Sequence, residues 1–89
     1  GALTGGSVIA GTGTIDDKGS VGPIGGIAQK MVGAREGGAT FFLAPADNCA
    51  EAAGREPSGL QVVKVSTFDD ALAAVTAIGK GNTSGLPHC

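Results

Sequence analysis

The sequence predicts an α+β fold whose strands and helices follow in the α/β-like order β-β-α-β-α-β-α. Segments rich in β-branched residues alternate with segments whose apolar residues recur at helical spacing, which is typical of a sheet covered by helices. The 17 glycines are spread along the chain without a Gly-X-Y period, which indicates tight turns and close backbone contacts rather than a collagen-like repeat. The 89 residues suffice for one small domain.

The beginning of the chain predicts a β-hairpin. Residues 7–10 are apolar and rich in β-formers, and the glycine and threonine alternation of residues 11–15 continues the strand. Residues 16–19 (Asp-Asp-Lys-Gly) carry a turn signal, and residues 20–21 resume extended structure. Pro23 then breaks the second strand.

A helix is expected to begin near Gly25. Its apolar residues recur at i, i+3, i+4 and i+7 and form one face: Ile24, Ile27, Ala28 and Met31. Gly37 and Gly38 end the helix, because glycine at this place accepts the left-handed conformation that stops it. Residues 40–44 then predict a short buried strand closed by Pro45.

The second half of the chain predicts a further strand between two helices. Asp47 or Asn48 can cap a brief helix through Ala53, and residues 59–66 predict the strand. Thr67 is the expected N-cap of a final helix that ends near Gly79, with acidic residues in its first turn that suit the helix dipole. The expected buried stripe of this helix is Phe68, Leu72, Val75 and Ile78.

We expect residues 1–79 to form the folded unit and residues 80–89 to form an irregular tail that ends in Cys89. The other cysteine is Cys49, so the two thiols are either unrelated or joined in one disulfide that ties the tail to the body. The tail is otherwise hard to explain, so we expect the bond and, with it, an extracytoplasmic location. Closing about 40 residues would contribute roughly 4 kcal/mol in the chain-entropy model.

Composition excludes several classes of function. A net charge of −2 without a basic stripe or stacking aromatics argues against a nucleic-acid partner. No apolar run approaches the roughly 18 residues of a membrane span, and no signal peptide is visible. Two isolated cysteines do not form a zinc site. The glycine-rich residues 22–26 do not match a dinucleotide fingerprint, and residues 79–81 lack the other positions of a phosphate-binding loop. We therefore expect neither a metal nor a cofactor.

A lysine is the one candidate for a catalytic base. The single histidine, His88, lies in the tail, and this position argues against a Ser-His-Asp triad in this chain. Lys30 lies next to the apolar stripe of the first helix, and Gly26 and Gly33, at i−4 and i+3, leave room beside its ammonium group. The residues alone still favour the ordinary interpretation, a solvated helical lysine.

Two motifs flank the expected hairpin: residues 2–5 (Ala-Leu-Thr-Gly) precede it, and residues 21–30 (Val-Gly-Pro-Ile-Gly-Gly-Ile-Ala-Gln-Lys) end the hairpin and open the helix. Their order resembles the second half of the Lon protease domain. In that family a Pro-Ile-Gly-Gly helix start places the catalytic lysine four residues after the second glycine, and Lys30 matches this position. The resemblance continues through residues 38–45 and on to about Ile78.

The resemblance implies the C-terminal part of a proteolytic domain with a fold similar to domain 2 of ribosomal protein S5. It also implies a Ser–Lys dyad that cleaves protein or peptide substrates, in which the lysine activates the serine and backbone donors hold the oxyanion. The family serine lies in a Gly-Pro-Ser-Ala-Gly segment that would precede Gly1. We therefore expect the base without its nucleophile and no activity from this chain alone. Thr4 matches a family threonine near the dyad, whereas Ser58, in a segment that imitates the serine motif, follows the lysine.

Three departures qualify the resemblance. Gly6 stands where cytosolic Lon proteins usually have an acidic residue, the hairpin is longer through residues 13–19, and the cysteine pair is foreign to cytosolic Lon. With these three features the chain resembles membrane-anchored bacterial proteins that join a PDZ domain to a Lon-like protease domain. This likeness implies a location on the outer side of the cell membrane, held by an anchor upstream, with the cytoplasm as the alternative. The resemblance to the Lon family as a whole implies a ring-shaped, hexameric parent. The alternative function is a non-catalytic assembly module of a degenerate homologue.

Overall fold

The computed structural model describes residues 8–89 and has a mixed α+β architecture, which confirms the predicted class at that level. Its strands and helices are β1 (Ile9–Gly11), β2 (Thr14–Ile15), β3 (Val21–Gly22), α1 (Ile27–Glu36), β4 (Phe41–Pro45), the 3-10 turn η2 (Ala46–Asn48), α2 (Cys49–Ala52), β5 (Gln61–Val65) and α3 (Phe68–Gly79).

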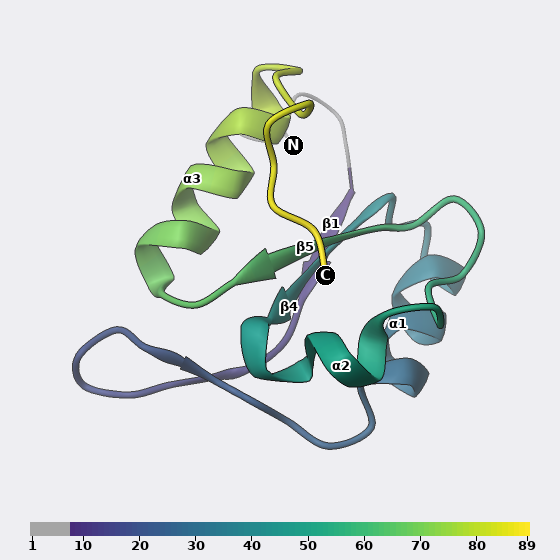
Figure 1. The fold of residues 1–89 in the computed structure, drawn as a ribbon. Helices are drawn as coiled ribbons and strands as arrows, with labels where there is room; N and C mark the ends of the chain where they lie inside the picture. The colour runs from purple at the N-terminus through teal and green to yellow at the C-terminus, as the bar shows by residue number, and fades with distance from the viewer. Residues whose placement is uncertain (1–7) are drawn as a thin grey trace.

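The centre of the fold is a parallel three-stranded sheet in the order β1-β4-β5. All five residues of the middle strand β4 are buried, as expected for a parallel strand that is covered on both faces. Figure 1 shows α1 and α2 on one side of this sheet and α3 on the other. The molecule therefore has three layers, and its helices define two separate halves of the core.

Alternate residues of the sheet supply the two halves of the core, because successive side chains of a strand point to opposite faces. On one face, Phe42 and Val62 pack with Ile27 and Met31 of α1. On the other face, the sheet packs against Ala74 and Ile78 of α3 through four residues, Phe41, Leu43, Val63 and Val65. Since Ile27 and Met31 are fully buried, α1 is fixed in its rotation about its own axis.

The prediction of one continuous strand over residues 7–15 is wrong for residues 8–15, the part that the structure describes. The chain pairs with β4 as β1, leaves the parallel sheet, and only then forms the expected hairpin as β2 and β3. Gly13, at φ 143°, lies at this crossing, and a Cβ there would stand 2.9 Å from Val21 Cγ1 and 3.2 Å from Pro45 Cγ. Glycine is required because the two strands and the end of β4 approach each other so closely.

The end signals of the helices are confirmed. α1 gives way to Gly37, and α3 ends at Gly79. Thr67 caps α3: its Oγ1 accepts the N–H of Asp70 at 3.0 Å, and Asp70 Oδ2 accepts the N–H of Thr67 at 3.1 Å. This reciprocal pair is a capping box, so the start of α3 is encoded within four residues.

The predicted buried stripe of α3 is wrong at two positions. Phe68 and Leu72 are 48% and 50% exposed, whereas Ala74 and Ile78 are each 3% exposed. The helix faces the sheet with its smaller residues, and the partly buried Ala71 completes the spacing i, i+3, i+7. Helical periodicity identifies an apolar stripe, but only contact with the sheet decides which of two overlapping stripes is covered.

Candidate functional site

Lys30 lies in the first half of α1, between the two residues of the helix that are fully buried. Its neighbours Ile27 and Met31 are fully buried, while Lys30 itself is exposed. Side chains three and four residues apart share a helix face, so the buried pair directs the lysine to the border of the packed face. The prediction that Lys30 lies beside the apolar stripe is therefore confirmed. Its catalytic role stays a prediction.

Glycines lie close to Lys30 in sequence on both sides, at positions 25, 26 and 33. Gly26 precedes α1 with φ 70°, a left-handed conformation that favours glycine, and its carbonyl accepts the Lys30 N–H at 3.1 Å. A Cβ placed on Gly25 or on Gly33 would meet no described atom within 4 Å. Of the two glycines predicted to leave room beside the lysine, Gly33 has open space, and a Cβ on Gly26 would meet only Gln29 Oε1, at 3.9 Å.

Two polar contacts hold the segment that carries Lys30. Before the helix, the N–H of Ile24 donates to Oδ1 of Asn48 at 2.9 Å, and Nδ2 of Asn48 donates to the Ile24 carbonyl at 2.8 Å. At the other end, Arg35 donates from Nε to the Ser58 carbonyl at 3.0 Å and from Nη1 to the Ala39 carbonyl at 3.1 Å. The helix is therefore tied at both ends to loops that flank the sheet.

The contact made by Asn48 corrects one expectation. Neither Asp47 nor Asn48 caps the following helix with its side chain. Instead the Asn48 carboxamide, 4% exposed, reaches across to the residue before the Gly25-Gly26 pair. The sequence contained a weak signal for this, an amide placed three residues after the wholly apolar strand β4, but the partner lies 24 residues away. Local patterns do not identify such a partner.

Among the other residues considered for the chemistry, Ser58 falls within the described residues, and it contacts the opposite end of α1 from Lys30. Thr4 lies outside the described residues, as does the upstream segment expected to hold the serine. Ser58 lies in the loop before β5, and its carbonyl contacts Arg35 at the far end of α1. No cluster of three or more potential metal ligands occurs within residues 8–89. Over the same residues, the helices are too short or too polar to span a membrane.

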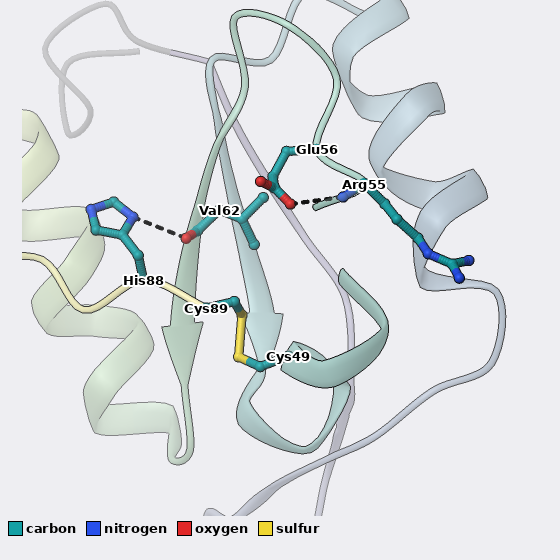
Figure 2. The surroundings of a disulfide bond; sticks show 6 residues. All are labelled: Cys49, Arg55, Glu56, Val62, His88 and Cys89. Atoms are coloured by element: carbon teal, nitrogen blue, oxygen red, sulfur yellow. Dashed lines mark hydrogen bonds between the residues drawn. A yellow bond between two sulfur atoms is a disulfide. The ribbon is translucent and has the colours of Figure 1, made fainter. Parts of the chain in front are cut away.

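The two cysteines form a disulfide between α2 and the tail (Figure 2). The Cys49 and Cys89 Cα atoms are 4.8 Å apart, within the usual range of bonded pairs. The tail lies along the outer edge of β5, where the Lys64 N–H donates to the Pro87 carbonyl at 3.0 Å and His88 Nδ1 contacts the Val62 carbonyl at 3.0 Å. Because a carbonyl only accepts, Nδ1 carries the proton in this contact.

Comparison with known proteins extends over most of the chain. Residues 3–77 match the family described as the Lon protease (S16) C-terminal proteolytic domain. A Lon protease of Azospirillum brasilense is 42% identical over 67 residues, which cover 72% of this chain and 8% of the relative. Lon protease 1 of Sorangium cellulosum (strain So ce56) is 44% identical over 70 residues, which cover 75% of this chain and 9% of the relative.

The chain therefore spans less than a tenth of the length of these two relatives. The matched region nevertheless contains the hairpin, the glycine-flanked lysine helix and the parallel sheet. These comparisons confirm the resemblance that the Pro-Ile-Gly-Gly motif indicated. The chain belongs to the family of the Lon protease C-terminal proteolytic domain.

Proposed function

We propose that this chain is the C-terminal part of the proteolytic domain of a Ser–Lys dyad endopeptidase, and that Lys30 is the general base. The observation that carries the proposal is the exposed Lys30 at the motif position of a family-matched helix. Open backbone at Gly25 and Gly33 would let a second segment approach the lysine closely. The nucleophilic serine belongs to a segment N-terminal to Gly1.

In the proposed reaction, the amine of Lys30 accepts the proton of the serine hydroxyl as the serine oxygen attacks a peptide carbonyl. The tetrahedral oxyanion is held by backbone donors, and its collapse breaks the C–N bond and returns the proton to the leaving amine. Water then hydrolyses the acyl-enzyme with the same lysine as base. Thr4 is proposed to support the dyad by a hydrogen bond. No part of this scheme requires a metal or a cofactor.

The decisive experiment uses the longer parent protein with the substitution Lys30→Ala. Loss of the general base is expected to lower kcat for casein or a peptide by at least about 10³-fold. Lys64→Ala is the matched control, because Lys64 is an exposed lysine on β5 and is expected to leave turnover unchanged. Unchanged turnover of the Lys30 variant would refute the catalytic assignment. Cleavage by the 89-residue chain alone would refute the missing-serine proposal.

A non-catalytic assembly role is the competing interpretation of the same fold. The residue in the upstream Gly-Pro-Ser-Ala-Gly position separates the two, because without a serine there Lys30 has no hydroxyl to activate. Sequencing the parent gene upstream of Gly1 supplies that residue. Any other residue at that position would favour the assembly role.

We further propose an extracytoplasmic location for the parent, of the membrane-anchored PDZ–Lon-like kind and assembled as a hexameric ring. The Cys49–Cys89 disulfide supports the location, because such bonds persist in oxidising compartments. Thiol counting in the unfolded, unreduced protein as isolated from its natural host tests the disulfide. Two reactive thiols in that sample would remove the argument for the location, and light scattering of the parent tests the ring.

A further inference from the structure

We infer that Asn48 is a positioning residue whose carboxamide fixes the Ile24 peptide unit and, through it, the start of α1 and the place of Lys30. The inference rests on the proposed role of Lys30 as the base. It assigns to Asn48 a part in catalysis without contact between Asn48 and the reacting atoms.

The first support is the geometry of the contact. Both polar groups of Asn48 bind one residue: Oδ1 accepts the Ile24 N–H at 2.9 Å, and Nδ2 donates to the Ile24 carbonyl at 2.8 Å. A carboxamide that engages the N–H and the C=O of the same residue fixes that residue in orientation as well as in distance. The contact therefore acts as a two-point clamp across 24 residues of chain.

The second support is burial. Asn48 is 4% exposed and is the sole buried polar side chain in residues 8–89. A buried amide is costly unless its donors and acceptors are paired, so a specific polar group in this position demands a specific partner. The side chain also makes no capping bond to α2, although asparagine at a helix start often does so. The carboxamide is committed to Ile24 instead.

The third support is the short path from the clamp to the lysine. Only Gly25 separates Ile24 from Gly26, whose carbonyl accepts the Lys30 N–H at 3.1 Å. Two successive glycines leave the backbone with many accessible conformations, so the local sequence does not fix where α1 begins. An anchor immediately before the glycines supplies the missing restraint. On the other side, Cys49 joins α2 to the tail, so the anchor itself stands on a covalently held turn.

The chemistry of the clamp requires asparagine. Alanine loses both hydrogen bonds. Aspartate keeps the acceptor for the Ile24 N–H but presents a second oxygen to the Ile24 carbonyl, where only a donor fits. Asn48→Ala and Asn48→Asp therefore form a pair in which the second variant nearly preserves the side-chain shape.

The experiment compares these two variants with Lys30→Ala and Val63→Ala in the full parent protein. Val63 is fully buried on the α3 face of the sheet, so its variant reports general loss of stability without touching the clamp. Both Asn48 variants are expected to lower kcat for a peptide substrate by roughly 10- to 100-fold with KM within about threefold, since small misplacement of a catalytic group costs rates of this size. Val63→Ala should retain kcat.

Hydrogen exchange gives a second readout that is independent of the reaction. Protection of the Ile24 amide, which pairs with Asn48, and of the Lys30 amide, which pairs with Gly26, is expected to fall at least about tenfold in Asn48→Ala relative to Val63→Ala. If Asn48→Ala does not fold, Asn48→Asp decides the question. An Asn48 variant that folds and matches the kcat of Val63→Ala overturns the inference, and so does unchanged exchange at Ile24.

The two proposals fail in different ways. Inactive Lys30→Ala together with fully active Asn48 variants leaves Lys30 as the base and removes the positioning role. A fully active Lys30→Ala variant refutes the proposed function, whatever the Asn48 variants do. The positioning role of Asn48 in catalysis is then refuted as well.

Discussion

The disulfide between α2 and the tail is expected to supply a large share of the stability of this chain. Cys49 and Cys89 are separated by 40 residues, and closing a loop of that length removes roughly 13 cal/mol/K of entropy from the denatured chain, or roughly 4 kcal/mol at 25 °C. A chain of 89 residues is typically stable by only about 4–13 kcal/mol. The double variant Cys49→Ala with Cys89→Ala should therefore lose a third or more of the free energy of unfolding.

The hydrogen bonds of the tail contribute less. The contacts made by Pro87 and His88 with the edge of β5 are each expected to contribute about 1 kcal/mol net. Ordering a single residue of backbone costs a similar 1–2 kcal/mol or so, so these bonds alone barely hold the tail. The covalent link is what keeps the tail on β5. His88→Ala in the oxidised protein is the matched control and should cost about 1 kcal/mol or less.

Urea unfolding followed by circular dichroism measures both variants, because the chain has neither tryptophan nor tyrosine for fluorescence. The midpoint of the double variant should fall steeply, while that of His88→Ala should move little. Hydrogen exchange should show the Lys64 amide deprotected in the double variant alone, since this amide pairs with Pro87. A loss below about 1 kcal/mol in the double variant, or an equal loss in His88→Ala, would refute the reasoning.

Three further predictions concern stability. Gly33→Ala should stabilise the chain by about 0.5–1 kcal/mol, because the methyl group meets open space on a helix. Gly26→Ala should destabilise it by about 1–2 kcal/mol, because Gly26 has a positive φ. Changes of the same sign in the two thermal unfolding midpoints would contradict the assigned backbone. Thr67→Ala should cost about 1 kcal/mol through loss of the capping box, and an unchanged midpoint would exclude that role. Ile78→Ala should lower the free energy of unfolding by about 2–5 kcal/mol and Leu72→Ala by about 1 kcal/mol or less. A larger loss for Leu72→Ala in urea unfolding would support the buried stripe expected from the sequence.

The position of Lys30 on its helix could be predicted from the local sequence. Glycine spacing and the apolar stripe placed the lysine on the border of the buried face of α1, and the structure agrees. The clamp on the preceding Ile24 was not predictable, because its other half, Asn48, lies after the next strand. The position of Lys30, the proposed base, thus depends on a contact that has no sequence signature near the lysine itself.

Residue patterns predict those elements whose ends are encoded within a few residues. The left-handed Gly38 (φ 95°) after α1, Pro45 at the end of β4 and the Thr67 capping box are local steric and hydrogen-bond effects, so short stretches of sequence encode them. The count of two cysteines also left one intramolecular pairing, between Cys49 and Cys89.

Residue patterns do not predict which helix faces and strand edges are covered. The departure of the first strand at Gly13 depends on crowding by Val21 and Pro45, the exposure of Phe68 depends on how α3 lies on the sheet, and the tail takes the free edge of β5. Each of these outcomes is set by contact between distant segments. The hydrophobic effect favours the burial of any apolar surface and is not directional. Shape complementarity between those segments therefore selects the surface that is covered.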